Sequence, residues 1–401
     1  MLRFFFAAVV SVTLLPNLAH AEDTETLPAG VSSPQIRVGI VSGLGETWGN
    51  DHNLYNLGET KSVPFDAQTL AKVNVQAQAL INALNLLGTQ GLGSQINLGT
   101  LNVNTQPEVT YFAPVFAYGI NDKWTIGVGL PVVNYQNHIQ LSSSGSNLDF
   151  YRQQLGDIPA IAGLANLNLV TEAQKVLAAK GYMPLQDRNE TYLADAQIAV
   201  MHRLPDYQDW NFMHAMTLTL PTGPAYNPDD LMALNTFGRT SVANSLIAAY
   251  AVRPRWTIIP YAGLETPIPD QVSRRVPVDE NDLLPDADTK QTVTRYLGMT
   301  TTLGADLKWD ATETWQFKTG TTFAWHAEDV YQGTGRMDLL EENTDSYVQI
   351  VKAGVSYSTI DSYKRRRAKI PSRVSLEVSD TVDGRNIERQ LRTDISAMIF
   401  F

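Results

Sequence analysis

The sequence of 401 residues contains no cysteine and few charged residues. The absence of cysteine excludes disulfides, thiolate zinc sites, thiol nucleophiles and a lipid-anchored cysteine. Charged residues make up 18% of the chain, against about 25% in an average soluble domain, while apolar residues reach 44%. The net charge of −11 and the lack of a basic stripe exclude nucleic acid as a partner, because phosphate binding requires clustered basic residues.

Long apolar segments are also lacking. A membrane-spanning helix requires roughly 18 or more continuous apolar residues, and no segment beyond the N-terminus offers them. The N-terminus carries Arg3, an apolar run from Phe4 to Leu15, and small residues up to Ala21, which is typical of a secretory signal peptide. We expect residues 1–21 to be this signal and the mature chain to comprise residues 22–401. A mature membrane protein of this sequence must therefore cross the bilayer with strands.

The last eleven residues alternate as a strand does. Arg392, Asp394, Ser396 and Met398 occupy one face. The opposite face ends on Ile395, Ala397, Ile399 and Phe401. This ending resembles the assembly signal of Gram-negative outer-membrane barrels, which implies the barrel-assembly machinery, outer-membrane lipid and lipopolysaccharide as partners. The alternative is a soluble protein whose last strand ends in phenylalanine.

The rest of the chain divides into strands joined by alternating short and long connections, as a barrel with both ends in the periplasm requires. The predicted strands are residues 35–43, 108–118, 124–134, 191–203, 210–221, 239–252, 256–266, 292–308, 314–325, 346–358, 373–380 and a last strand after the turn at Asp383-Gly384. The sequence thus predicts an all-β fold: a transmembrane antiparallel up-and-down β-barrel of about twelve strands. Long insertions fall at about 44–97 and 142–190.

Tryptophans open four strands immediately after short turns. They are Trp124, Trp210, Trp256 and Trp315. Because indole prefers the headgroup level of a bilayer, these residues predict a periplasmic aromatic girdle. The alternative is that each simply packs at a hairpin end against a soluble core.

Three motifs carry a resemblance. They are Tyr118 to Trp124, Gly127 to Pro131, and Leu218 to Gly223. Together they resemble the outer-membrane family of meta-pathway phenol-degradation proteins. That resemblance implies a barrel of about this size, located in the outer membrane and linked to the uptake of aromatic or other hydrophobic compounds. The sequence departs from the related fatty-acid channels because it has no Asn-Pro-Ala plug motif near the mature N-terminus.

Both long insertions show helical spacing of apolar residues. The spacing predicts helices over residues 66–88 and 161–181. An apolar helix face must be buried, so such helices can cover the outer mouth, plug the lumen, meet a neighbouring protein, rest on lipid, or pack against their own loops.

The polar face of the strands predicts the lumen. The candidates for lumen selectivity are Asp306, Lys318, Lys352, Arg373, Glu377, Arg392 and Asp394. These charges either pair and narrow the lumen or polarise a path for small solutes. No catalytic constellation, metal site or cofactor motif is recognisable, so we expect a non-enzymatic outer-membrane channel for passive uptake of small, hydrophobic or aromatic molecules. The alternative function is a non-conducting structural or adhesive barrel that binds a partner through its outer insertions.

Overall fold

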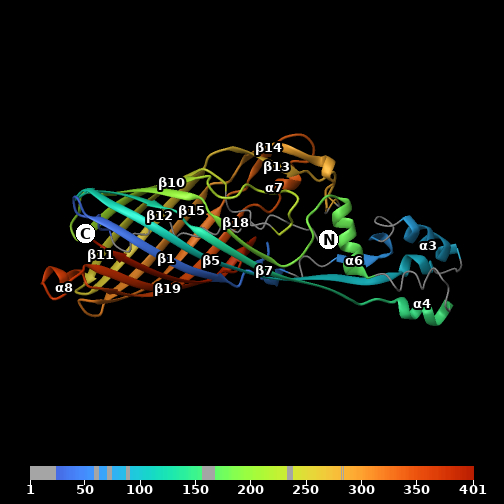
Figure 1. The fold of residues 1–401 in the computed structure, drawn as a ribbon, viewed down its shortest axis with the longest axis horizontal. Coiled ribbons are helices and arrows are strands. Elements are labelled where there is room, and N and C mark those ends of the chain that lie inside the picture. The colour runs from blue at the N-terminus through green and yellow to red at the C-terminus, as the bar shows by residue number, and fades with distance from the viewer. Residues whose placement is uncertain are drawn as a thin grey trace.

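The structure is a computed structural model that describes residues 24–57, 63–69, 75–86, 91–155, 168–232, 238–280, 282 and 284–401. The expected signal peptide, residues 1–21, lies outside this part. Within it, no helix is long and apolar enough to cross a membrane. The main body is a cylinder of tilted strands, and a smaller part extends beyond one end (Figure 1).

In the described part of the chain, twelve antiparallel strands close into a barrel, which confirms the predicted fold class. The strands in chain order are β1 (Ser32–Ser42), β5 (Asn97–Asn121), β6 with β7 (Trp124–Gly129, Val132–Ser144), β8 with β9 (Arg188–Leu193, Ala196–Arg203), β10 (Trp210–Leu220), β11 (Ser241–Arg253), β12 (Trp256–Pro267), β15 (Thr300–Asp310), β16 (Trp315–His326), β18 (Ser346–Ser358), β19 (Ser372–Arg385) and β21 (Leu391–Ile399). Closure comes from β1, which pairs with both β21 and β5.

The last residue helps to close the ring. The Phe401 N–H donates to the Ser32 carbonyl at 3.0 Å, and the Ser32 N–H donates to the Phe401 carbonyl at 2.9 Å. The C-terminus therefore lies beside the start of β1, at the end of the barrel that carries the short turns and helix α8 (Ile360–Lys364) (Figure 1). In outer-membrane barrels this is the periplasmic end.

Two of the twelve strands are interrupted at neighbouring positions. Leu130-Pro131 separates β6 from β7, since proline has no N–H for the ladder. On the next strand Asp195 separates β8 from β9, and its carboxylate accepts hydrogen bonds from the N–H groups of Gly223, Gly238 and Arg239 at 2.8 to 3.3 Å. Asp195 thus ties the loop between β10 and β11 to the barrel wall.

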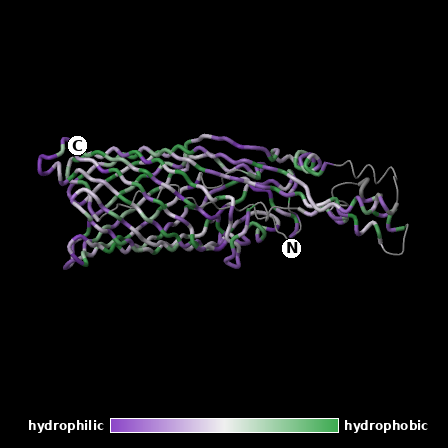
Figure 2. The backbone as a smooth tube through the Cα atoms, turned by 90° about the horizontal axis from the view of Figure 1, so that it is seen from below, coloured by the Kyte–Doolittle hydropathy of each residue, from purple (hydrophilic) through white to green (hydrophobic). Residues whose placement is uncertain are grey.

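The outer face of the barrel is apolar. On β1, for example, Ile36, Val38 and Ile40 are between 44% and 51% exposed, while Val41 is fully buried on the inner face. Figure 2 shows the same alternation along the crossing strands. Because all main-chain groups of such a wall pair between strands, the apolar side can face lipid.

Two predicted boundaries were wrong. Residues 292–296 do not belong to a barrel strand but to β14 (Lys290–Tyr296), which forms a separate outer sheet with β13 (Asp270–Arg275) and β17 (Val330–Gln332). Asp383-Gly384 was predicted as the turn before the last strand, but it lies within β19. The connection to β21 comes after β19 and contains β20 (Ile387–Glu388). β20 pairs with β2 (Glu46–Trp48), which also pairs with β3 (Leu54–Asn56). Both errors involve segments whose alternation fits any sheet.

The two insertions pack against each other beyond the outer end of the barrel (Figure 1). Their described elements are β4 (Val63–Asp66), α3 (Val75–Leu86), η1 (Leu92–Gln95), α4 (Leu148–Leu155) and α6 (Leu169–Ala179). A shared apolar core is formed by Phe65, Ala67, Ile81, Leu84, Ile96, Leu98, Leu101, Leu148, Tyr151, Leu169 and Ala173. The buried faces of α3 and α6 therefore pack into one core that the two insertions share. Residues 70–74, 87–88 and 161–167 of the predicted helices lie outside the described residues.

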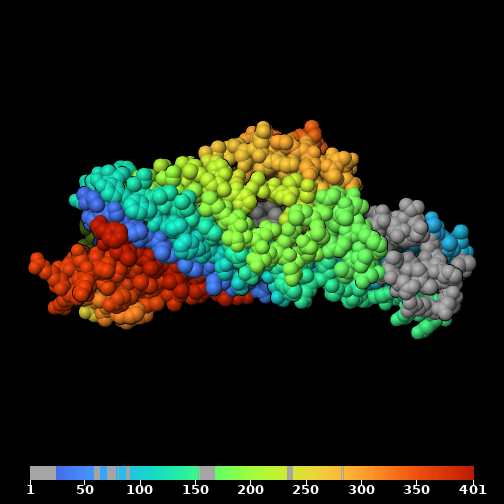
Figure 3. All heavy atoms as spheres, in the orientation of Figure 1, coloured from blue at the N-terminus to red at the C-terminus, as the bar shows by residue number. Residues whose placement is uncertain are grey.

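A buried arginine holds the outer loops together. The Arg275 guanidinium donates to Asp229 at 2.7 Å and to the carbonyls of Lys180 and Gly181 at 2.6 and 2.9 Å. Lys290 contacts the second oxygen of Asp229 at 2.6 Å. The loops before β8, before β11 and around η2 (Ala287–Thr289) are thereby joined, and they form one raised surface over the outer half of the barrel in Figure 3.

This cluster gives the outer loops a dependence on pH. Burial raises the pKa of Asp229, but hydrogen bonds from Lys290 and Arg275 outweigh it and hold that pKa below the usual 3.8. Because the pKa of Asp229 is lower in the folded state, its ionisation stabilises the folded loops at pH values above 3.8. This contribution to stability is lost as the pH falls through the pKa of the folded state. Limited proteolysis should therefore cut these loops faster below pH 3.8. The outer loops of Asp229→Asn should be cut faster already at neutral pH, and their cutting rate should no longer rise as the pH falls below 3.8. The same rise at low pH in this variant would show that Asp229 does not cause the pH dependence.

Candidate transport path

The register of five adjacent strands assembles two rows of inward-facing residues. The outer row is Arg392, Ser379, Lys352, Gly320 and Asp306. The row on its periplasmic side is Asp394, Glu377, Gly354, Lys318 and Lys308. We call these ten residues the charged belt. Outward neighbours such as Leu303, Leu307 and Trp309 are exposed to the lipid side, which fixes the facing.

Opposite charges pair both within and between the two rows of the belt. Lys352 Nζ lies 2.9 Å from Asp306, and Lys318 Nζ lies 3.1 Å from Glu377 and 3.8 Å from Asp306. Arg392 Nε lies 2.5 Å from Asp394. The Lys352 and Asp306 side chains are each only 8% exposed, so this pair is shielded from bulk water. The belt is thus a fixed, mixed-charge surface rather than a filter of one sign.

Two tyrosines cross neighbouring strands to reach the belt. Tyr261 on β12 lies over Gly304 on β15, and its hydroxyl contacts Thr322 at 2.5 Å and Lys352 at 3.2 Å. In the same way Tyr111 on β5 lies over Gly39 on β1 and reaches Arg392 and Asp394. A side chain at either glycine would occupy the ring's place, because a Cβ at Gly304 would stand 2.2 Å from Tyr261 Cζ.

Gly304→Ala should therefore displace Tyr261 and destabilise the barrel by about 1–3 kcal/mol, the usual cost of overpacking. Removing the ring in the double variant Gly304→Ala/Tyr261→Ala should relieve the clash, so the two effects should be strongly non-additive. Unfolding by denaturant in detergent measures both. Additive effects would show that the ring does not need the space above Gly304.

Part of the remaining inward face of the barrel is apolar. Val41, Val109 and Val133 on β1, β5 and β7 continue the belt on one side, and Ile259, Ile247 and Met213 on β12, β11 and β10 continue it on the other. All six are at most 3% exposed. We call these six residues the apolar arc. Because the strands close into a ring, the apolar arc and the charged belt face each other across the lumen.

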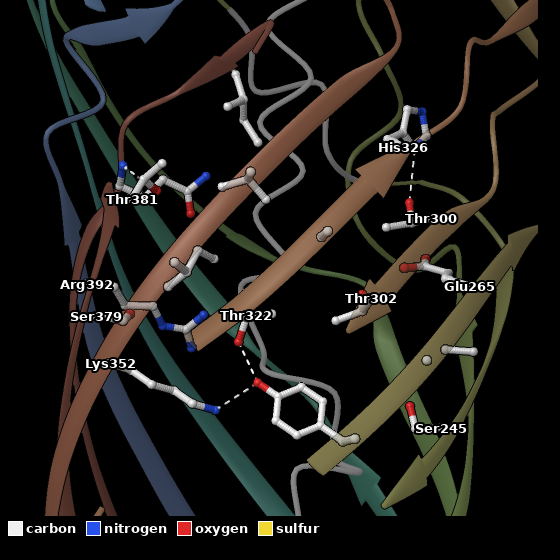
Figure 4. Close-up of a pocket in the computed structure, with 18 of the residues that line it drawn as sticks. Ser245, Glu265, Thr300, Thr302, Thr322, His326, Lys352, Ser379, Thr381 and Arg392 are labelled. Atoms are coloured by element: carbon white, nitrogen blue, oxygen red, sulfur yellow. Dashed lines mark hydrogen bonds between the residues drawn. The ribbon is translucent and has the colours of Figure 1, made fainter. Parts of the chain in front are cut away.

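A cavity of about 190 Å³ borders the belt, and Ile247 is the one residue of the arc that lines it. It extends from Arg239, Glu265 and His326 near the outer mouth down to Lys352 and Arg392 (Figure 4). Hydroxyl groups line its middle part, among them Ser245, Thr302, Thr322, Ser379 and Thr381. The cavity therefore offers charged, hydroxyl and apolar contacts within one space.

The structure brings together six of the seven predicted lumen residues: Asp306, Lys318, Lys352, Glu377, Arg392 and Asp394 all belong to the belt. Arg373 also faces inward but lies closer to the periplasmic mouth, where it stands opposite Met398 and Ser358. Tyr111 and Tyr261 were not predicted. Their inward phase on β5 and β12 could have indicated a lumen position, but nothing local shows that they cross a glycine.

The four predicted girdle residues lie at the periplasmic end of the barrel, and Trp124, Trp256 and Trp315 are 38% to 45% exposed. Each indole meets an aromatic ring of the neighbouring strand: His202, Tyr250, Trp309 and Tyr357 respectively. Trp309 was missed because it precedes a turn instead of following one. The anchoring role of this ring stays a prediction.

A histidine at the outer rim contacts both a hydroxyl and a carboxylate. His326 Nδ1 lies 3.0 Å from the Thr300 hydroxyl, and its Nε2 lies 3.0 Å from Asp329. Thr300 sits inside the ladder between β12 and β16, where main-chain N–H groups pair with neighbouring strands. No oxyanion site is therefore offered beside its hydroxyl, and the chain Thr300–His326–Asp329 is best explained as a structural hydrogen-bond network.

No family model matches the chain, and no curated protein matches its sequence. Among solved structures, the COG4313 outer membrane channel from Pseudomonas putida F1 is similar, with a TM-score of 0.53, 11% identity, and coverage of 94% of this chain and 98% of that one. The toluene transporter TbuX from Ralstonia pickettii scores 0.32 with 10% identity, covering 94% and 90%. Only the first likeness is high enough to indicate a shared fold.

That fold and the apolar outer face place the protein in the bacterial outer membrane. The narrower resemblance to meta-pathway phenol-degradation proteins stays a prediction.

Proposed function

We propose that this barrel is an outer-membrane channel for the passive uptake of small molecules that have an apolar, aromatic or aliphatic, part. The observation that carries the proposal is a cavity lined by belt residues, by hydroxyl groups and by apolar side chains such as Ile247, Val348 and Ile350. An apolar solute finds contact on these apolar side chains, while the belt and the hydroxyls replace the water around any polar group. The similar COG4313 protein is an outer membrane channel, which agrees with this proposal.

In this proposal the belt residues and Arg373 set the preference of the channel, the four tryptophans anchor the periplasmic rim, and Ile395, Ala397, Ile399 and Phe401 are read by the barrel-assembly machinery. Outer-membrane lipid and lipopolysaccharide surround the apolar face. No step requires a cofactor.

Conductance across a planar bilayer tests the proposal. The wild-type barrel should give discrete current steps, and benzyl alcohol, which has a ring for the arc and a hydroxyl for the belt, should reduce them. A silent barrel would overturn the channel function.

Lys318→Glu tests the role of the belt. It replaces a cation by a carboxylate beside Glu377 and Asp306, so the reversal potential in a salt gradient should move toward cation preference. Lys123→Glu, in the short turn outside the lumen, is the matched control and should leave the potential unchanged. Equal shifts in both variants would show that the belt does not set the selectivity.

A second candidate function is supported by two exposed apolar side chains beyond the barrel. Leu86 at the end of α3 is 87% exposed, and Phe150 on α4 is 50% exposed. A non-conducting barrel could present them to a protein partner. The double variant Leu86→Ser/Phe150→Ser should then abolish the cellular function without changing conductance. If the protein is a channel, variants of the belt should instead change conductance, and the double variant should leave the cellular function intact.

A further inference from the structure

The connection between β18 and β19 carries the densest positive charge of the chain. Residues 364–369 read Lys-Arg-Arg-Arg-Ala-Lys, so five of six positions are cationic in a chain whose net charge is −11. All five cations are exposed. Helix α8 and this segment project beyond the strands at the periplasmic end of the barrel (Figure 1). We call residues 364–369 the basic turn.

Carboxylates neutralise only part of the basic turn. Lys364 Nζ lies 3.7 Å from Asp361, and the Arg365 guanidinium contacts Glu313 at 2.5 Å. The other three cations contact no carboxylate within the part of the chain that the structure describes. They are Arg366, Arg367 and Lys369. Three positive charges of the basic turn are therefore left for an anion from outside the chain.

One of these three cations occupies a position that favours glycine. Arg366 follows the end of α8 with a φ of 59°, in the left-handed region. Its N–H donates to the Tyr363 carbonyl at 2.8 Å, and the Arg367 N–H donates to the Ser362 carbonyl at 2.7 Å. This is a Schellman motif, in which glycine is usual because a Cβ is strained there. Main-chain N–H groups already satisfy the helix end, so the arginine side chain is not needed as a cap. Its presence in a strained position indicates a use for its charge.

The basic turn lies beside aromatic rings on the lipid side of the barrel. Glu313, the partner of Arg365, stands two residues before Trp315. The centroid of the Trp315 ring lies 5.1 Å from that of Tyr357, and both residues are exposed on the outer face. Because tryptophan and tyrosine prefer the headgroup level of a bilayer, the cations stand beside the headgroups of the periplasmic leaflet.

Exposed apolar side chains accompany the cations. Tyr363 precedes the basic turn and Ile370 follows it, and they are 46% and 56% exposed. Cationic and apolar groups on one element are typical of contact with anionic lipid, whereas a hydrated sugar polymer such as the cell wall needs no apolar surface. Guanidinium groups also match the oxygens of a phosphate with two parallel hydrogen bonds.

We propose that the basic turn binds the phosphate groups of anionic phospholipids, such as phosphatidylglycerol, in the periplasmic leaflet of the outer membrane. The lipid headgroups supply the negative charge that the chain itself does not place beside Arg366, Arg367 and Lys369. This site is independent of the proposed channel function, because lipid binding is measured on the purified barrel without transport.

Native mass spectrometry of the barrel in detergent tests the site with phosphatidylglycerol and with zwitterionic phosphatidylcholine. Wild type should bind phosphatidylglycerol more tightly. Arg366→Gly should weaken this binding roughly fivefold, and Arg366→Gly/Arg367→Gln/Lys369→Gln roughly a hundredfold, since each cation near an anionic surface contributes about 1 kcal/mol. Binding of phosphatidylcholine should not change. Lys123→Gln removes one cation from another turn at the same rim, so it is the matched control and should bind both lipids like wild type.

Arg366→Gly also separates binding from folding. Glycine adopts the left-handed conformation without strain, so this variant should resist denaturant at least as well as wild type while it binds phosphatidylglycerol more weakly. Inorganic phosphate, added at the concentration of the lipid, should not displace phosphatidylglycerol, because it lacks the apolar part of the lipid.

The proposal is overturned if wild type binds the two lipids equally, or if the triple variant keeps the preference of wild type. Displacement of the lipid by an equal concentration of inorganic phosphate would replace the lipid site by a site for free phosphate. Loss of co-sedimentation with purified peptidoglycan in the triple variant, together with an unchanged lipid preference, would assign the cations to the cell wall instead.

Discussion

Deletion of residues 391–401 should abolish assembly of the barrel. The deleted segment contains all of β21, which pairs with β19 on one side and with β1 on the other, so its loss leaves two open edges in the wall. Unpaired main-chain groups cannot face lipid without a large cost. The shortened protein should therefore be absent from outer-membrane fractions and show no heat-modifiable band on electrophoresis.

A milder change separates closure from recognition. Phe401 is hydrogen-bonded to Ser32 through its main chain, and the residue is 71% exposed. Phe401→Ala keeps these hydrogen bonds, so it should reduce the yield of assembled protein while leaving the stability of the assembled fraction unchanged. A heat-modifiable barrel in normal yield from the deletion variant would contradict the closed-ring account.

Asp306→Asn should be the most damaging single substitution in the lumen. Asp306 lies 2.9 Å from Lys352 and 3.8 Å from Lys318, and its side chain is 8% exposed. Removing its charge leaves Lys352 buried without that counter-charge, and breaking a buried pair in this way costs about 3–5 kcal/mol. Denaturant unfolding in detergent measures the loss.

Glu377→Gln is the matched control for this substitution. Its carboxylate also contacts Lys318 but is 30% exposed, so water can replace it and the loss should be much smaller. Equal losses in the two variants would show that burial of the Lys352–Asp306 pair does not determine the stability of the belt.

Local patterns were sufficient to predict most of the barrel wall. β18 has the predicted bounds, Ser346–Ser358, because inward and outward residues alternate without interruption between two clear turns. The error over residues 292–308 arose where two sheets follow each other. Thr292 to Tyr296 has the same alternation as a barrel strand, and only its pairing with β13 and β17 assigns it to the outer sheet.

The sequence also allowed us to predict which side chains of the belt face inward, but not which of them stand next to each other in a row. The facing of a side chain depends on the alternation within its own strand, whereas a row depends on the register between strands. Tyr111 and Asp394 are 283 residues apart in the chain, and the contact between them exists only because Gly39 lies between their strands. The same limit applies to Lys308 and Lys318, whose opposition follows from the register of β15 and β16.

The helical insertions show a related limit. Apolar spacing correctly indicated helices at α3 and α6, but it did not show where their faces are buried. The partners include residues of the other insertion, since Leu84 and Leu169 belong to one core. A single apolar stripe carries no information on which surface will cover it.

The proposed channel requires a continuous path through the lumen along the belt. Ser356 faces inward on the periplasmic side of the belt, and Val351 faces lipid on the same strand. Because the native chain has no cysteine, a charged thiol reagent acts only on an introduced one. In planar bilayers, Ser356→Cys should conduct like wild type and lose current when the reagent is added from either side, while Val351→Cys should not respond. A barrel without current, or current that the reagent does not reduce in Ser356→Cys, would contradict a path along the belt.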